Sequence, residues 1–329
     1  MRPLMLALLT VPVAAQVTTA PTLQARFLSR ADASRVLAAD DYFSLLHVPE
    51  LRAKTGLPLT GMDTPQARAA AKAYYAESAQ DFTEGEKAAI QTLLAAVAPE
   101  VTAKLPLMAR TPFTFIKSGV EGGLPHTRGA CIVLSPRLLA FFAQAAQRNP
   151  TAFGRAAGGL LVHEQTHVLE RQHPDLFAKL FTEVFGFRRL PSAPDAPSLA
   201  EVRVVNPDGP DLAWAFPVPV GKATRWIRPD LRLGELEHPK MPQDFQEIAV
   251  DLIEKDGTFA LDLDAKGAPK VEPLDAITAY RAAFTGVDEA FHPNEIAAVL
   301  ISGWITGDPK TATLSLRQRT ADWAAAALR

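Results

Sequence analysis

The segment from residue 160 to residue 170 contains His163, Glu164 and His167 within a largely apolar run. Residues four apart project from one face of an α-helix, about one turn from each other. Two imidazole nitrogens at this separation can bind one Zn²⁺ ion at about 2.0–2.1 Å. Glu164 stands beside the first histidine, where its carboxylate can take a proton from a zinc-held water. The pattern therefore predicts one zinc ion and a hydrolytic reaction with Glu164 as general base.

This spacing is specific, because His-Glu-x-x-His arises by chance in about one chain of this length in a hundred. The alternative is an amphipathic helix whose two histidines are solvated or hydrogen-bonded. Ala157, Leu161 and Val168 are among the residues available for burial around the motif. Ionisable residues within such an apolar helix usually have a function, so we favour the metal site.

The run His163-Glu164-Gln165-Thr166-His167 resembles the zinc-binding helix of the zincin metallopeptidases. The resemblance covers this helix and one further motif downstream. It implies an α+β fold that is mostly helical and two-lobed, with a small mixed sheet and an active-site cleft between the lobes. It also implies that zinc-activated water hydrolyses peptide bonds in a peptide or protein substrate.

The third zinc ligand has two candidates. Glu295, within Pro293-Asn294-Glu295, resembles the gluzincin ligand, a glutamate on a later helix that completes the site. His173 has the spacing of the metzincin pattern, but Glu170 stands where that pattern has glycine, at a sharp turn that disfavours other residues. If the helix continues instead, His173 points away from the metal. Glu295 is therefore the preferred ligand, and His173 is the alternative.

Side chains that orient the histidine ligands are less clearly marked. Glu170 lies seven residues after His163, on the same stripe of the helix. It either orients a ligand histidine or forms a salt bridge with a nearby arginine, and the salt bridge is slightly preferred. The gluzincin resemblance implies an aspartate four residues after the ligand glutamate, but Val299 stands there. Asp251 and Asp288 are the candidates to replace it.

The resemblance further implies a histidine or tyrosine that stabilises the oxyanion. Tyr280 and His292 are the preferred candidates, with Arg128 and His126 behind them. Residues 125–134 are expected to form the edge of a sheet, to which an extended substrate can add as a further strand.

Secondary structure is expected to be helical at first and mixed afterwards, which is typical of an α+β fold. Asp63 and Thr83 have the sequence context of helix N-caps, and Asp256-Gly257 is a hairpin signal. Helices are expected within residues 32–46, 67–75, 88–97, 137–148, 151–172, 175–185, 274–284, 293–302 and 312–328. Strands are expected at 113–117, 130–134, 248–253 and 258–263.

The N-terminus has the pattern of an export signal at residues 1–15. Arg2 supplies a positive charge, residues 4–13 are apolar, and Val13-Ala14-Ala15 offers a small-residue cleavage site. The apolar run is too short for a stable membrane anchor. We therefore expect a secreted or periplasmic protein without an anchor after cleavage.

The remaining chain is divided into an N-terminal helical region, 16–110, and a zincin-like catalytic region, 111–329, with a strand-rich insertion at about 196–265. Composition indicates a folded protein, because 48% of the 329 residues are hydrophobic and only 21% are charged. The 34 basic residues do not outnumber the 36 acidic ones, which argues against nucleic acid as a partner. Cys131 is the single cysteine, so an intramolecular disulfide and a cysteine-rich metal site are excluded.

A second functional hypothesis is a catalytically silent, secreted module that binds peptides or proteins on the same scaffold. The missing aspartate and the unassigned oxyanion donor motivate it. The intact His163, Glu164 and His167 argue against it, because a silent relative does not need all three.

Overall fold

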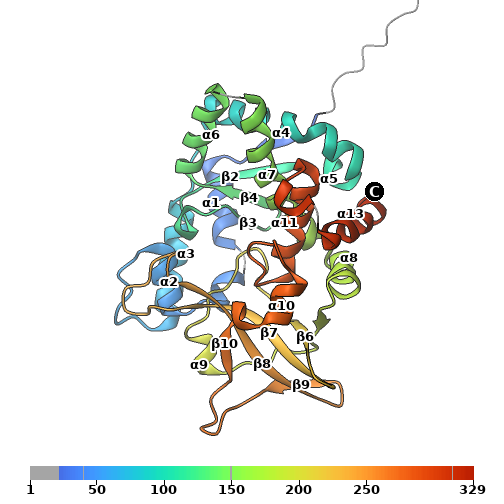
Figure 1. Cartoon of the computed structure of the whole chain (residues 1–329). Coiled ribbons are helices and arrows are strands. Elements are labelled where there is room, and N and C mark those ends of the chain that lie inside the picture. The colour runs from blue at the N-terminus through green and yellow to red at the C-terminus, as the bar shows by residue number, and fades with distance from the viewer. Residues whose placement is uncertain (1–21, 40, 149, 313) are drawn as a thin grey trace, which may run out of the picture.

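The computed structural model describes residues 22–39, 41–148, 150–312 and 314–329. The fold is α+β, with helices packed around two separate β-sheets. In Figure 1 the smaller sheet lies among the helices, and the larger sheet lies below them. The predicted export signal at residues 1–15 falls outside the described residues.

The smaller sheet consists of β1 (Ala25–Phe27), β2 (Phe113–Lys117), β3 (His126–Arg128) and β4 (Cys131–Leu134). Its order is β1-β2-β4-β3, with β3 antiparallel to β4 and the other neighbours parallel. Successive side chains of a strand point to opposite faces. Ile132 and Leu134 accordingly join one apolar core, whereas Cys131 and Val133 join another. This mixed sheet is therefore buried on both faces.

The helices before residue 80 pack on the face that carries Val133, whereas the later helices of the N-terminal region lie on the other face. The helices before residue 80 are α1 (Arg30–Ala39), η1 (Asp41–Leu45), α2 (Val48–Thr55) and α3 (Thr64–Glu77). The helix expected through residue 46 ends at Ala39, and a 3-10 segment, η1, follows it and buries Tyr42 and Phe43. Asp63 caps α3 by accepting a hydrogen bond from the Gln66 amide at 2.8 Å, as the sequence predicted.

The other face of the sheet is covered by longer helices. These are α4 (Glu84–Lys104), α6 (Pro136–Arg148) and α7 (Pro150–Gln172), with α5 (Pro106–Arg110) after α4. The predicted capping box opens α4, where Thr83 accepts from the Glu86 amide and donates its own amide to the Glu86 carboxylate. Pro150 begins α7, and Pro174 begins the next helix.

Helix α7 lies between α4 and α11 (Pro293–Thr306). Two adjacent glycines on α7 make this close approach possible. A Cβ atom on Gly158 would lie 2.9 Å from the backbone oxygen of Leu93 on α4. A Cβ atom on Gly159 would lie 2.8 Å from the Thr306 side chain on α11. Side chains on α7 and α11 are therefore held close to each other.

The larger sheet has the order β10-β8-β7-β6-β5, and β9 pairs with β8. Its strands are β5 (Arg188–Arg189), β6 (Trp214–Val220), β7 (Ala223–Leu233), β8 (Phe245–Lys255), β9 (Thr258–Leu261) and β10 (Val271–Pro273). Asp256 and Gly257 form the turn between β8 and β9 with φ of 52° and 79°, as the hairpin signal predicted. The strands extend beyond residues 196–265 at both ends.

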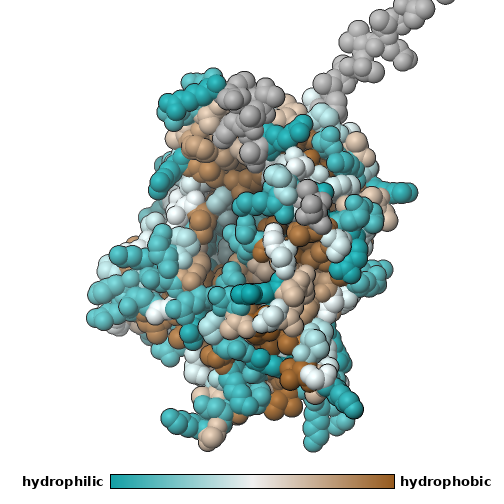
Figure 2. All heavy atoms as spheres, viewed as in Figure 1, coloured by the Kyte–Doolittle hydropathy of each residue, from teal (hydrophilic) through white to brown (hydrophobic). Residues whose placement is uncertain are grey.

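Further helices complete the fold, most of them short. They are α8 (Pro174–Lys179), η3 (Leu180–Val184), α9 (Pro197–Ala200), η4 (Leu274–Ala276), α10 (Thr278–Ala283), α12 (Pro309–Ala312) and α13 (Ser315–Ala327). Across the described ranges, no helix combines the length and apolar character needed to cross a bilayer. On the face in Figure 2, hydrophobic side chains appear as patches among hydrophilic ones.

Candidate metal site

The two motif histidines lie on α7, one turn apart, as their spacing predicted. Their rings are 4.8 Å apart between centroids, and the two Nε2 atoms are separated by 3.1 Å. His167 is completely buried, whereas His163 retains some exposure at the wall of a cavity. Both Nε2 atoms therefore point toward one position beside that cavity.

Glu295 joins this pair from the first turn of α11, which is 128 residues further along the chain. Its Oε2 atom lies 3.3 Å from His163 Nε2 and 3.4 Å from His167 Nε2. Three donors bound at 2.0–2.1 Å to a tetrahedral zinc ion are about 3.3 Å from one another. The three observed separations match this value. His163, His167 and Glu295 thus form a group that can hold a metal ion, and its donor set suits zinc.

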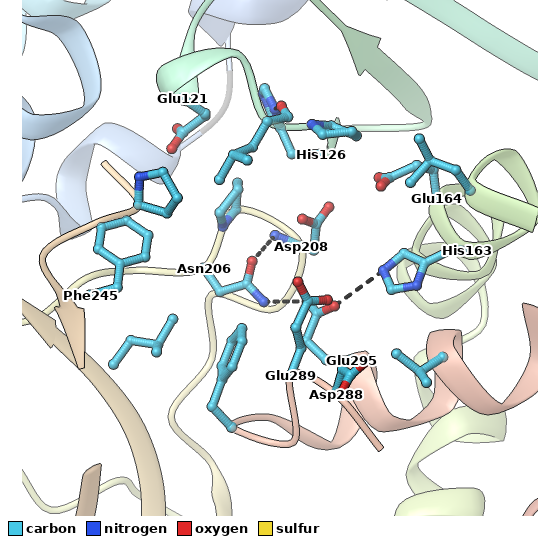
Figure 3. A pocket seen from close by; sticks show the side chains of 18 of the residues that line it. Glu121, His126, His163, Glu164, Asn206, Asp208, Phe245, Asp288, Glu289 and Glu295 are labelled. Carbon is cyan, nitrogen blue, oxygen red and sulfur yellow. Dashed lines mark hydrogen bonds and ion pairs between the residues drawn. The ribbon is translucent and has the colours of Figure 1, made fainter. Parts of the chain in front are cut away.

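Glu164 lies on the cavity wall next to this group. Glu164 is only 3% exposed, and its Oε2 atom has no hydrogen-bond partner among the residues that the structure describes. Burial, followed by the charge of Asp208, raises the pKa of Glu164 well above its ordinary value. A buried carboxylate oxygen without a partner is costly, so its position fits an acid or base that meets a ligand in the cavity. This cavity has a volume of about 690 Å³ (Figure 3).

Glu170 orients one of the histidines. Its Oε2 atom lies 2.9 Å from His167 Nδ1, which leaves Nε2 for the metal. The preference for an arginine salt bridge was wrong, because Arg171 instead donates to Thr127 Oγ1 and to the Pro207 carbonyl. The helix brings Glu170 to the histidine three residues before it, not seven.

The rival ligand His173 is absent from the group. Helix α7 continues to Gln172, and His173 is the residue before α8, with φ −131° and ψ 54°. The left-handed turn required by the metzincin pattern does not form. The structure therefore places Glu295, not His173, beside the motif histidines.

The two preferred oxyanion donors lie elsewhere. Tyr280 donates its hydroxyl hydrogen to the Ala290 carbonyl at 2.6 Å and packs against Phe216 and Phe284. His292 precedes α11 as its N-cap: Nδ1 accepts from the Asn294 amide, and Nε2 lies 3.2 Å from the carbonyl oxygen of Asp211. Neither side chain lines the cavity beside Glu164, so neither is retained as a catalytic residue.

The two reserve candidates occupy the edge strand β3. Arg128 is buried over the ring of Tyr42 and pairs with Glu121 at 3.3 Å. The position expected to add an extended substrate is occupied, because the Thr127 amide donates to Asp208 Oδ1 at 2.6 Å. A substrate strand has to displace Asp208 to pair there.

Neither candidate aspartate orients a ligand. Asp251 on β8 accepts hydrogen bonds from Arg225. Asp288 is exposed and lies 3.6 Å from Lys310. Glu170 fulfils the orienting role for His167 in their place.

Sequence reasoning missed two residues that support or face the site. Asn206 donates to Glu295 Oε1 at 2.6 Å and so holds the carboxylate toward the histidines. Asp208, two residues later, contributes to the electrostatics of Glu164 and His167. Both residues belong to segment 206–210, which has the composition of a turn. This composition gave no sign of a metal site nearby.

Comparison with known proteins identifies no relative. No family model matches the chain, and neither a curated protein nor a solved structure matches it significantly. The local resemblance of the motif therefore stands on its own residues and on their geometry.

Proposed function

We propose that this protein is a secreted or periplasmic, zinc-dependent metallopeptidase with a zincin-like, two-lobed arrangement around its cavity. One observation carries the proposal: His163, His167 and Glu295 converge from two helices with the spacing of a zinc site, and Glu164 lies beside them with an unpaired buried oxygen. A closed structural zinc site would have four protein ligands and would give Glu164 no role.

Zinc, when bound, supplies a Lewis acid that lowers the pKa of a coordinated water to about 7. Glu164 would act as the general base and take the proton of the attacking water as its oxygen bonds to the peptide carbonyl carbon. It would then give this proton to the amide nitrogen as the C–N bond breaks, which suits the pKa that burial raises. Glu170 and Asn206 keep His167 and Glu295 in position.

A catalytically silent module that binds peptides or proteins is the second candidate. It is favoured by the positions of Tyr280 and His292, which face away from the cavity and cannot stabilise an oxyanion there. The geometry around Glu164 favours the peptidase.

The function is tested with unstructured peptides and with two variants of the site. We expect His163→Ala to lose zinc and activity together. Glu164→Gln removes the general base without removing a ligand, so it should retain zinc while turnover falls by about 10²–10⁴-fold. Metal content is measured by mass spectrometry and turnover by peptide cleavage. Glu183→Gln, which makes the same change on an exposed side chain elsewhere, is the control.

Two results would contradict the proposal. Undiminished cleavage by Glu164→Gln would show that another group is the base. A wild-type protein that binds zinc but cleaves none of a broad peptide library would support the silent module instead.

A further inference from the structure

The cavity beside the metal site is lined by many more acidic than basic side chains. Some of these charges are balanced within the protein. Glu121 pairs with Lys54 at 3.0 Å, and Glu295 and Glu164 together match the charge of a Zn²⁺ ion. Asp288 lies near Lys310. These residues therefore contribute little net charge to the cavity.

Four carboxylates remain after this balance: Asp208, Glu247, Glu289 and Asp308. Asp308 accepts a hydrogen bond from the Lys310 amide at 2.9 Å, and the other three are considered below. Within the described part of the chain, Glu247 and Glu289 form no ion pair or hydrogen bond. Asp208 accepts both of its bonds, from the Thr127 amide and hydroxyl, on Oδ1, so Oδ2 is available to a ligand. Figure 3 places Asp208 and Glu289 in the same part of the cavity as Glu295. This part of the wall is negative and offers acceptors.

Glu289 reaches the cavity from the loop before α11, and its backbone has φ 62°. This left-handed conformation is unfavourable for residues other than glycine. Desolvation at the cavity wall and then the charge of Glu289 raise the pKa of Glu247, although both side chains remain exposed. Both carboxylates line the same cavity, so a cation bound there would be attracted to each of them.

His126 adds an independent, buried acceptor on the same cavity. Its side chain is 1% exposed, and Nδ1 lies 2.9 Å from the Leu124 carbonyl oxygen. A carbonyl oxygen only accepts hydrogen bonds, so Nδ1 carries the proton and Nε2 of the neutral ring is an acceptor. Burial lowers the pKa of His126 and favours this neutral form. Nε2 has no partner, and it is suited to receive a hydrogen bond, not to stabilise an oxyanion.

We propose that this wall, formed by Asp208, Glu247, Glu289 and His126, binds a positively charged group of the substrate. The inference rests on the proposed peptidase function and names the substrate class: peptides that present an ammonium or guanidinium group beside the metal. An α-ammonium at the peptide N-terminus and a lysine or arginine side chain share this chemistry. In either case the negative charge of the carboxylates attracts the cation, and the hydrogen-bond acceptors orient its N–H groups.

The test compares peptides that are identical except for lysine or norleucine at one position, which is moved along the peptide. Each peptide is made with a free and with an acetylated N-terminus. We expect zinc-loaded protein to cleave the cationic member with a kcat/KM on the order of tenfold higher. Glu289→Gln should reduce that preference several-fold, measured as the ratio of kcat/KM between the two members of a pair. Glu183→Gln should not alter the preference.

A binding measurement separates this inference from the proposed function. Fluorescence anisotropy with zinc-loaded Glu164→Gln reports peptide affinity without cleavage. If no peptide is cleaved by wild type but the cationic ones bind more tightly, the peptidase proposal fails and the cation site stands. If lysine and norleucine peptides are cleaved and bound equally, and free and acetylated peptides are too, or if no peptide binds, the cation site is wrong. A preference for the free over the acetylated N-terminus assigns the site to the N-terminal ammonium. A preference for lysine over norleucine that survives acetylation assigns the site to a side chain.

Discussion

The cavity is bordered by two buried groups of charged residues that differ in how their charges are balanced. On the side of the N-terminal region, Lys54 lies 3.0 Å from both Glu50 and Glu121. Arg128 pairs with Glu121 and stacks on Tyr42. Every one of these ionic side chains is at most 3% exposed. This ionic cluster pairs its two carboxylates with two cations of its own, although one oxygen of Glu50 accepts no hydrogen bond from a described residue.

On the opposite side, the metal site leaves its charges unsatisfied by protein. Three donor atoms of His163, His167 and Glu295 point at one position instead of at separate partners. Glu164 has a buried oxygen without a hydrogen bond, as Glu50 does, but it forms no ion pair with a described lysine or arginine. Glu170 and Asn206 hold two of the donors in place, but no described protein cation occupies the position at which the donors point, so a ligand has to do so.

The difference shows how to separate a structural from a functional buried charge. Both groups are largely buried, and both contain residues with strongly shifted pKa values. Burial alone therefore does not mark a site. Donor atoms that converge on one open position do mark a site. Substitutions in the ionic cluster should therefore change stability, and substitutions in the metal site should change metal binding.

The largest expected effect is on stability, from Lys54→Met. The substitution leaves Glu50 and Glu121 buried beside each other without their shared cation, which should lower the free energy of unfolding by about 3–5 kcal/mol. Urea unfolding followed by circular dichroism measures it. Lys87→Met, which removes an exposed pair with Glu84, should change the value by less than about 1 kcal/mol. Equal effects of the two variants would show that the cluster is not structural.

Acid should weaken the same cluster. Lys54 and then Arg128, acting against burial, lower the pKa of Glu121 to about 2 from 4.5. The folded state thus binds this proton less tightly than the unfolded state, so the stabilisation is complete above pH 4.5 and is lost as the pH falls toward 2. The contribution is at most about 1.4 kcal/mol per pH unit.

Urea unfolding at several pH values between 4.5 and 3 measures this slope, below the range in which Glu50 titrates, because burial raises the pKa of Glu50 to about 7. Comparison with Glu121→Gln isolates one carboxylate from the others, and the variant should show a smaller loss per pH unit. A variant with the slope of wild type would place the acid sensitivity elsewhere.

The smallest expected effect concerns metal affinity, from Glu170→Gln. The amide oxygen can still accept from His167 Nδ1, but the carboxylate charge that strengthens the histidine as a ligand is lost. Zinc affinity should fall by about 10–100-fold, as measured by competition with a chelator, with little change in unfolding. Unaltered affinity would mean that packing alone orients His167.

The spacing of residues along the chain was sufficient to predict the part of the site that lies on one helix. His163, Glu164 and His167 share a helix, and helical geometry fixes their relative positions wherever that helix lies. The caps at Asp63 and Thr83 were predictable for the same reason, because their hydrogen bonds span three residues. The α+β class also followed from local patterns.

Tertiary packing decided the rest of the site. Glu295 reaches the histidines because Gly158 and Gly159 allow α7 to lie against its neighbours, and sequence separation says nothing about that contact. Tyr280 and His292 have suitable chemistry, but a carbonyl partner and a helix terminus hold them elsewhere.

By itself, the sequence determined which residue types occupy one face of the metal-binding helix. The tertiary structure alone decided which distant carboxylate completes the group, which histidine Glu170 orients, and that Asp208, Glu289 and His126 face the same cavity. The physical reason is range: helix geometry follows from residues a few positions apart, whereas a shared cavity depends on how whole elements pack.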